Sequence, residues 1–379
     1  MNPNLKPEKT SSIEAGFEAA FWDNRLYLDF TYYKTDSRNQ ILKLATTAAS
    51  GYTSQVRNAG HIRNRGYEIQ LGAVPIQTSK GFRWNLDLNY GANSSKVVKL
   101  DDEGLITSYQ LYSSGIQILA SVGEAYGTLF GTSYVRDANG NVVVDANGLP
   151  KISTTNKTLG KFTPDWTGGI SNTFSYRSLS LSFLIDASVG GSIFSNTNKT
   201  GKYTGVLANT LSGRDAEHGG LWYYTDAMGN NVRLPESPSY SVSSDGLYYA
   251  QVNGQSTRVY QDGIMVEGVT ESGSKNEEVV SAEKYYHRIY SIAEANVYDA
   301  SYVKLREVAL SYRLPRLWTQ KLHLQEASVT LTGRNLWTIY KSVPNIDPES
   351  ALTTGNAQGV EAYSLPTTRS FGVNLSVKF

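Results

Sequence analysis

The chain has 379 residues, of which 40% are hydrophobic and only 18% are charged, and it is rich in Tyr and Gly, with 26 and 34 copies. That mixture favours strands and turns over helices. The absence of Cys excludes a disulfide framework and a thiolate metal site, and a formal net charge of +1 gives no reason to expect a nucleic-acid partner. No apolar run approaches the roughly 18 residues that a membrane-spanning helix needs.

The predicted strands come in pairs that are joined by short turns. Within each strand, apolar and polar residues alternate, which places them on opposite faces. The pattern predicts strands at about 12–21 and 26–33, 66–73 and 82–90, 166–176 and 179–187, 301–312 and 327–337. Between these pairs lie long polar connections, at about 37–65, 101–163 and 190–299.

The last strand has the clearest alternation. Its apolar side carries Phe371, Val373, Leu375, Val377 and Phe379, and the residues between them are polar or Gly. With this strand the chain has about nine, and short and long connections alternate throughout. Barrels of the bacterial outer membrane have this asymmetry, with short periplasmic turns and long extracellular loops.

Aromatic residues gather near the predicted strand ends, among them Phe21, Trp84, Tyr90 and Trp337. Two such belts are expected where rings lie at the level of the lipid headgroups. A soluble β-sandwich also alternates, with its apolar face on a core, but it does not explain aromatic residues at strand ends. The pattern therefore favours an all-β fold in which about nine antiparallel strands belong to a large transmembrane outer-membrane β-barrel.

Several short motifs along the whole chain resemble those of TonB-dependent outer-membrane receptors, and in particular of their SusC/RagA branch. The opening Asn2-Pro-Asn-Leu-Lys-Pro-Glu8 is similar to a motif that leads into a barrel strand in that family. The other similar segments follow in the same order as in the family: Leu28–Tyr33, Asn39–Ile41, Asn58–Gly60, Asn64–Glu68, Ala300–Arg306, Leu310–Pro315, Gly333–Leu336, Asp347–Glu349 and Leu365–Arg369.

The resemblance implies a receptor of 22 strands with an N-terminal plug and a TonB box. This chain shows neither, and its opening segment is not a signal peptide, so residues 1–379 are expected to be the C-terminal part of the barrel. An open sheet of nine strands would leave two unpaired edges in lipid. Phe379 at the end of an alternating strand resembles the signal that the outer-membrane assembly machinery reads, with Phe371, Val373, Leu375 and Val377 on the same face.

The resemblance also implies a function, a location and a set of partners. The function is TonB-dependent import of a glycan or peptide, in the outer membrane of a Gram-negative bacterium. The expected partners are outer-membrane lipid, an oligosaccharide or peptide substrate, a SusD-like surface lipoprotein, and TonB, which would act through the missing N-terminal part. The alternative is a non-transport surface β protein, such as an adhesin or a binding domain.

No set of residues predicts catalysis, a cofactor or a metal. The segment Asp137–Asp145 has oxygen ligands at spacings similar to a calcium loop, but Asp137-Ala-Asn-Gly repeats as Asp145-Ala-Asn-Gly, which two turns around a short strand explain without metal. The four His residues are scattered singly, and no Ser, His and Asp stand in a plausible triad order. We therefore do not expect an enzyme.

The longest connection contains three aromatic clusters. They are Trp222, Tyr223 and Tyr224, then Tyr248 and Tyr249, then Tyr285 and Tyr286. Aromatic faces pack against the apolar faces of sugars, and Tyr adds a hydroxyl that can form hydrogen bonds, so these residues are candidates for substrate contact. Equally, a long loop that folds on itself needs a small core of its own.

Overall fold

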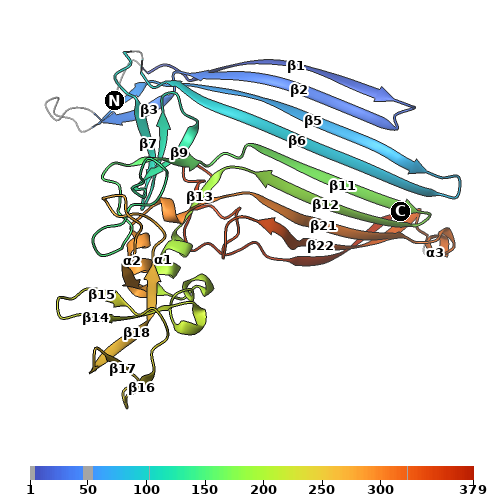
Figure 1. The fold of residues 1–379 in the computed structure, drawn as a ribbon. Helices are drawn as coiled ribbons and strands as arrows, with labels where there is room; N and C mark the ends of the chain where they lie inside the picture. The colour runs from blue at the N-terminus through green and yellow to red at the C-terminus, as the bar shows by residue number, and fades with distance from the viewer. Residues whose placement is uncertain (1–4, 46–53, 102, 322) are drawn as a thin grey trace.

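The computed structural model describes residues 5–45, 54–101, 103–321 and 323–379. Within these ranges nine long strands form one antiparallel sheet, in the order β1-β2-β5-β6-β11-β12-β21-β22-β24 (Figure 1). Their bounds are β1 Lys9–Phe21, β2 Leu26–Arg38, β5 His61–Gln77, β6 Phe82–Lys99, β11 Trp166–Tyr176, β12 Leu179–Val189, β21 Tyr302–Arg313, β22 Glu326–Lys341 and β24 Ser370–Lys378. The prediction of about nine antiparallel strands is confirmed.

The connections of this sheet alternate in length, as predicted. The short ones, at 22–25, 78–81, 177–178 and 314–325, all lie at the end of the sheet that holds the C-terminus (Figure 1). The last of them contains the helix α3, Arg316–Lys321. The long connections all lie at the opposite end and carry the rest of the chain. We call the segments 100–165 and 190–301 the first and second excursions.

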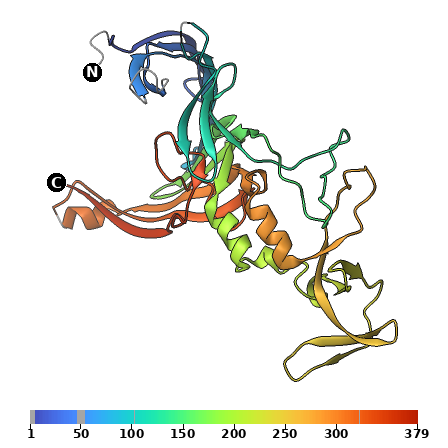
Figure 2. The same cartoon turned by 90° about the vertical axis from the view of Figure 1, so that its left-hand side faces the viewer.

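The sheet is open. In Figure 2, which shows the molecule from the end that carries the excursions, the first strands (blue) are foreshortened and the last strands (red) run across the view, so the sheet is twisted. Its two edges are the first and last strands: among the described residues, β1 pairs only with β2 and β24 only with β22. The backbone groups on the outer sides of β1 and β24 therefore have no ladder partner here.

Two rows of aromatic rings run across the sheet. Near the short turns Trp84 stacks on Phe174, with ring centroids 5.6 Å apart. Farther along the strands Tyr90 lies 6.1 Å from Tyr67 and 5.5 Å from Trp166. Rings in two rows are the arrangement expected at the two surfaces of a membrane.

Several strands are longer than predicted at the end of the sheet that carries the long connections, which we call the outer end. β6 has 18 residues and continues nine residues beyond Tyr90, whereas a crossing needs only about 9–11. The alternation of apolar and polar residues, on which the predicted strand bounds rest, ends at the aromatic row. The ladder itself continues through polar residues, such as Asp36 opposite Arg63, whose side chains form an ion pair at 2.9 Å.

The long connections fold into smaller units. The first connection holds the hairpin of β3 (Ile41–Ala45) and β4 (Ser54–Asn58). The first excursion forms a four-stranded sheet: β7 Ser108–Ser113, β8 Gln117–Ser121, β9 Tyr126–Gly131 and β10 Lys157–Lys161. The second contains the helices α1 (Asn196–Thr204) and α2 (Ala282–Tyr290), with short 3-10 turns at Ala208–Thr210, Ala216–His218 and Glu294–Asn296.

The far part of the second excursion is a separate sheet, visible at the lower left of Figure 1. Its strands are β14 Leu221–Thr225, β15 Asn231–Arg233, β16 Tyr240–Val242, β17 Tyr248–Val252, β18 Gln255–Met265 and β19 Val279–Ser281. A three-stranded sheet of β13 (Ser192–Ser195), β20 (Val297–Asp299) and β23 (Val360–Glu361) joins the second excursion to the last long connection. None of the described helices is long and apolar enough to cross a membrane.

Motifs that are far apart in the sequence meet at the outer end of the sheet. Asn2, Pro3 and Asn4 of the opening motif lie outside the described residues. The Lys6 backbone N–H donates to Asn58 Oδ1 at 2.6 Å, and Asn58 Nδ2 donates to the carbonyls of Lys6 and Asn39 at 2.7 and 2.8 Å. Glu8 Oε1 accepts from the N–H of Ile41 at 2.9 Å. These bonds fasten the start of β1 to the first long connection.

A buried ion cluster fastens the last long connection to β21. Lys304, only 3% exposed, donates to Asp347 at 2.6 Å and to Glu349 at 2.5 Å. Arg306 bonds Glu349 on the one side and Asp186 of β12, at 2.6 Å, on the other. Two of the family-like motifs, 300–306 and 347–349, thus form one network of alternating charges across three parts of the chain.

The cluster controls the ionisation of Asp347. Burial alone would raise the pKa of Asp347, but hydrogen bonds from Lys304 and Thr367 outweigh it and hold the pKa at about 2. A pKa below that of the unfolded chain means that the ionised carboxylate stabilises the fold above about pH 4. This contribution disappears as the pH falls towards 2.

We predict that Lys304→Met releases residues 342–361. The substitution leaves the buried Asp347 carboxylate without its cation, which costs about 3–5 kcal/mol. Amide hydrogen exchange should accelerate in 342–361 and stay unchanged in β1–β6. In the unmodified protein, the same segment should become susceptible to pepsin between about pH 4 and pH 2.

The matched control is Arg313→Met, in the same strand. It removes an exposed ion pair with Glu326, at 3.0 Å, and such pairs contribute little. Exchange in 342–361 should be unaffected by it. Unchanged protection of this segment in Lys304→Met would show that the cluster does not hold the connection in place.

Candidate functional site

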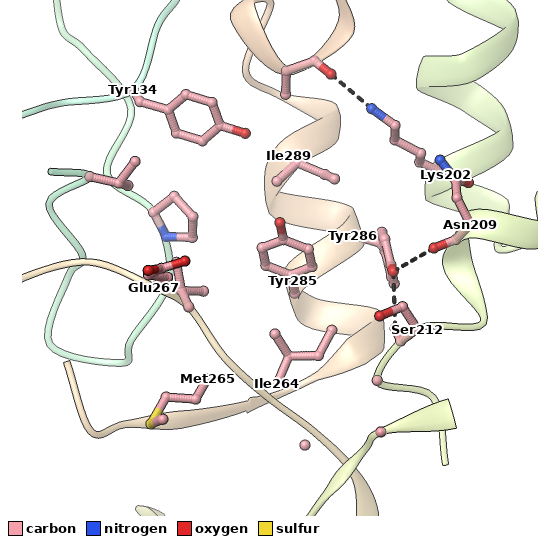
Figure 3. Close-up of a pocket in the computed structure, with 17 residues that line it drawn as sticks. Tyr134, Lys202, Asn209, Ser212, Ile264, Met265, Glu267, Tyr285, Tyr286 and Ile289 are labelled. Atoms are coloured by element: carbon pink, nitrogen blue, oxygen red, sulfur yellow. Dashed lines mark hydrogen bonds between the residues drawn. The ribbon is translucent and has the colours of Figure 1, made fainter. Parts of the chain in front are cut away.

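The two excursions enclose a cavity of about 580 Å³ at the outer end of the molecule (Figure 3). The first excursion contributes Tyr134, Val142 and Pro150 to its wall. The second contributes side chains from α1, α2 and the end of β18, together with the loops between them. Its volume is in the range of small-molecule sites, which are about 300–1,000 Å³.

The helix α2 places Tyr285 and Tyr286 in this wall. Its N-cap is Ser281, whose Oγ accepts from the N–H of Lys284 at 3.3 Å, and the buried Ile289 fixes its inner face. The hydroxyl of Tyr286 is shared between the carbonyls of Asn209 and Ser212, at 3.1 and 3.0 Å. The hydroxyl of Tyr285 forms no hydrogen bond with any described residue, and burial raises the pKa of Tyr285, so it remains a neutral donor.

Tyr134 faces α2 from the other excursion (Figure 3). Its backbone N–H donates to Glu294 Oε2 at 3.0 Å, which ties the two excursions together. Burial, with a smaller contribution from the nearby Tyr285, raises the pKa of Tyr134 well above the ordinary value of Tyr. Like Tyr285, its hydroxyl has no hydrogen-bond partner among residues 5–45, 54–101, 103–321 and 323–379.

Lys202 brings a buried positive charge to the cavity from α1. The start of this helix is fixed by the buried Glu361, which accepts from Ser195 Oγ at 2.7 Å and Thr197 Oγ1 at 2.6 Å. Lys202 is 8% exposed and donates to the carbonyl of Ala295 at 2.8 Å and to Asn296 Oδ1 at 3.3 Å. Its removal from water lowers the pKa of Lys202 to about 8. No carboxylate of a described residue forms an ion pair with it.

The other predicted aromatic residues lie in the far sheet of the second excursion. Trp222 and Tyr223 are only 7% and 4% exposed. Trp222 stacks on Tyr240, with centroids 5.1 Å apart, and meets Tyr248 edge-on at 5.7 Å. Tyr224 and Tyr248 pack against the core that Trp222 forms with Ala250 and Val259. Tyr249 is half-buried on β17.

Tyr223 has a polar partner as well as a stacked one. Its ring stacks on Tyr260 at 5.1 Å, and its hydroxyl donates to Asp262 Oδ1 at 3.2 Å. Of the seven predicted aromatic residues, therefore, only Tyr285 and Tyr286 line the cavity.

The segment Asp137–Asp145 forms the two turns that its repeat predicts. Asp137 Oδ1 accepts from the N–H groups of Asn139 and Asn141, and the N–H of Gly140 donates to the Asp137 carbonyl at 3.1 Å. Asp145 closes the second turn in the same way and also pairs with Arg288 of α2 at 3.0 Å. No group of three His, Cys, Asp or Glu side chains suited to a metal occurs in the described part of the chain.

The C-terminal strand presents the expected apolar face. Phe371 is 80% and Phe379 84% exposed, and Val373, Leu375 and Val377 project beside them. β24 pairs in register with β22 along its whole length, from Glu326↔Lys378 to Arg334↔Ser370. The apolar side chains thus lie along the open edge of the sheet, on a face that no described residue covers.

Sequence reasoning missed Tyr134, Lys202 and Glu267, which also line the cavity. None of them belongs to a motif: Tyr134 precedes a turn, Lys202 is one of two Lys residues on a short polar helix, and Glu267 follows β18. Only the contact between two excursions that are far apart in sequence brings them together. A weak signal existed for Lys202, because a Lys within a Thr- and Asn-rich segment has no acidic neighbour in sequence.

Comparison with known proteins agrees with this architecture. Residues 1–204 match the family model described as TonB dependent receptor-like, beta-barrel. The whole chain aligns with TonB-dependent receptor P3 of Formosa agariphila at 27% identity, and the alignment covers 35% of that receptor. It also aligns in full with TonB-dependent receptor SusC of Bacteroides thetaiotaomicron at 25% identity, over 32% of that protein. The chain therefore spans about a third of the length of these curated relatives.

Solved structures show the same fold. The chain superposes in full on 36% of the RagAB peptide transporter, with a TM-score of 0.63 and 20% identity. The RagAB peptide importer in its closed-closed state gives a TM-score of 0.64 at 20% identity, again over 36% of that chain. At this identity the likeness concerns the fold alone, a portion of a large antiparallel barrel.

The family model covers more than half of the chain, and the similarity to SusC-like proteins runs from end to end. Proteins of this family are transport receptors of the Gram-negative outer membrane rather than enzymes, so the nine strands belong in that membrane. The chain belongs to the TonB-dependent receptor β-barrel family, and within it to the proteins that resemble SusC and RagA.

Proposed function

We propose that the chain is the C-terminal part of a SusC-like receptor that imports a glycan or a peptide across the outer membrane. The observation that carries the proposal is the open sheet, with one free edge at β1 and another at β24. Nine strands that cover a third of a relative's length need the remaining strands to close a barrel. The plug and the segment that contacts TonB would belong to that remaining part.

The substrate and the lipoprotein would arrive at the excursions. RagAB is named a peptide transporter, and the resemblance to the SusC/RagA branch implies a SusD-like lipoprotein on the outer face. The second excursion presents the cavity and, beyond it, the far sheet with Tyr240 and Val242 exposed on β16. We assign substrate contact to the cavity aromatics and lipoprotein contact to the far sheet.

The buried aromatic residues would act indirectly. Trp222, Tyr223, Tyr224 and Tyr248 form the core that gives the far sheet its shape, so their truncation would alter the whole surface. The alternative, a surface β protein without transport, is disfavoured by membership of a transport-receptor family. A surface protein of that kind would bind its ligand without importing it, and the experiments below distinguish binding from uptake.

The isolated chain should not form a closed pore. The free edges of β1 and β24 would each expose unpaired N–H and C=O groups to lipid, at several kcal/mol for every group. Expressed alone and refolded in detergent, residues 1–379 should give no single-channel conductance and no heat-modifiable band. The full-length parent is the positive control, and either signal from the isolated chain would refute the proposed boundary.

Phe379→Ala in the full-length parent should lower the amount of receptor in the outer membrane. We propose that the exposed face of Phe371, Val373, Leu375, Val377 and Phe379 is what the assembly machinery engages, because it ends the open edge. Synthesis should be unchanged, and quantitative blotting of membrane fractions measures both. Leu365→Ala, at another exposed apolar residue but in a loop, is the matched control. Equal surface abundance of Phe379→Ala and the control would argue against this role.

Removing the far sheet should abolish partner binding but not insertion. Leu221 and Ser281 both pair with Gly263, so they flank one residue and a short Gly-Ser linker can replace 222–280. We expect the truncated parent to insert normally, to lose co-purification of its lipoprotein, and to fail to support growth on the cognate nutrient. Replacing α3 at the periplasmic end by a similar linker should leave both intact. If lipoprotein binding and uptake survive the removal of 222–280, the second excursion is only a structural cap.

A further inference from the structure

The cavity between the excursions contains a buried charge that the chain itself does not neutralise. Lys202 has two acceptors, both uncharged: the carbonyl of Ala295 and the amide oxygen of Asn296. An ammonium has three N–H donors, so one has no oxygen acceptor; the other neighbour of Nζ is the uncharged ring of Tyr298, whose centroid lies 5.2 Å away. A Lys as buried as this one is ordinarily paired with a carboxylate, as Lys304 is with Asp347 in the same molecule.

The neighbouring open polar groups are hydroxyls that can donate. Tyr134 and Tyr285 approach each other from the two excursions, and neither hydroxyl has a hydrogen-bond partner among the residues that the structure describes. Burial keeps both phenols protonated, because it raises the pKa of Tyr134 and the pKa of Tyr285. Both hydroxyls reach the open cavity, where water can satisfy them, so an acceptor group of a ligand would take the place of that water.

Charge selects the kind of ligand. A neutral hydroxyl group can satisfy Tyr134 and Tyr285, but it leaves the charge of Lys202 uncompensated. A second cation would be repelled by Lys202. A carboxylate suits each of the three groups, since it accepts several hydrogen bonds and bonds to charged donors are the strong ones.

Glu267 lies across the cavity from Lys202 in the view of Figure 3. It is exposed and has no hydrogen bond or ion pair with a described residue. From the opposite wall of the cavity it would accept hydrogen bonds from the hydroxyl or ammonium groups at the other end of a ligand.

We propose that this cavity is a subsite for the carboxylate of the imported substrate, with Lys202, Tyr134 and Tyr285 as the groups that bind it. A uronic acid residue of a glycan and the free C-terminus of a peptide both supply this chemistry. The inference rests on the proposed function, since it concerns the substrate that the receptor takes up. It adds an acid-selective site on the excursions, outside the barrel wall.

The test measures binding by isothermal titration calorimetry with the full-length parent in detergent. The probes are digalacturonic acid and its uncharged analogue galactobiose, and the tripeptide Ala-Tyr-Ala and its C-terminal amide. We expect at least one acid to bind ten times or more tightly than its neutral counterpart. Preference for digalacturonate only would identify a glycan source, preference for the peptide acid only a peptide source, and preference for both the shared carboxylate. The absence of any acid preference overturns the proposal.

The variants locate the site. Lys202→Met should reduce the acid's affinity at least tenfold and make acid and neutral probe bind equally. Tyr134→Phe and Tyr285→Phe remove only a hydroxyl, and each should weaken acid binding about fivefold. Lys199→Met is the matched control: Lys199 lies one turn earlier on α1, 4.2 Å from the Tyr290 ring, and does not line the cavity. Acid affinity that is unchanged in Lys202→Met, or lost equally in Lys199→Met, contradicts the assignment.

Two further measurements keep the outcome decisive. Heat-modifiable migration and lipoprotein co-purification show whether each variant is folded, and if Lys202→Met is not, the double variant Tyr134→Phe/Tyr285→Phe decides instead. Its control is Tyr240→Phe, which removes a hydroxyl from the far sheet. Uptake that depends on 222–280 in a receptor without acid preference would sustain the proposed function and defeat only this inference.

Discussion

Pairing of backbone groups between neighbouring strands is the constraint on which the rest of this structure depends. In lipid an unpaired backbone N–H or C=O cannot form a hydrogen bond with water. Every such group of a membrane-spanning sheet must therefore bond to a neighbouring strand. Among the described residues, β1 and β24 each have a partner on one side only. The same constraint explains why the short connections are so short. Two residues between β11 and β12 suffice because antiparallel neighbours need only a turn.

Outside the membrane, water can satisfy backbone groups, so strand pairing is no longer obligatory. There, side-chain contacts hold the long connections in place. The strands continue past the outer aromatic row as polar ladders, and the long connections are then fastened to them by buried ionic and polar groups. Lys304 and Arg306 hold the last connection against β21, and Glu361 of that connection fixes the start of α1. Because α1 carries Lys202, the position of the cavity depends on a segment that follows it by more than a hundred residues.

The two buried lysines illustrate how different a charge can be in one molecule. Lys304 has two carboxylates within 2.6 Å and is fully compensated, which fits a structural role. Lys202 has only neutral acceptors and lines an open cavity beside two free phenols. Both lysines are buried, so the difference lies in whether a carboxylate of the chain neutralises the charge. A neutralised lysine holds the fold together, and one without a carboxylate is available to a ligand.

The sequence by itself determined the nine long strands, their order and the family, but not the shorter strands within the long connections. Alternation with a period of two is a local property of the chain, so the apolar face of residues 370–378 can be predicted from that segment alone. The lengths of the connections are equally explicit, and from them the two ends of the barrel follow. Motifs such as 300–306 and 347–349 marked the family, although nothing in the sequence said that they bond to each other.

Only the tertiary structure decided which aromatic residues are core and which face a cavity. Trp222 and Tyr285 both belong to aromatic clusters of the second excursion, yet one is closed in by Tyr240 and Tyr248 and the other meets Tyr134 from a different excursion. Strand lengths beyond the aromatic row also escaped prediction, because polar residues in water carry no alternation. The physical reason is the same in each case: burial and charge compensation arise from contacts between segments far apart in the chain, and a pattern of neighbours does not contain them.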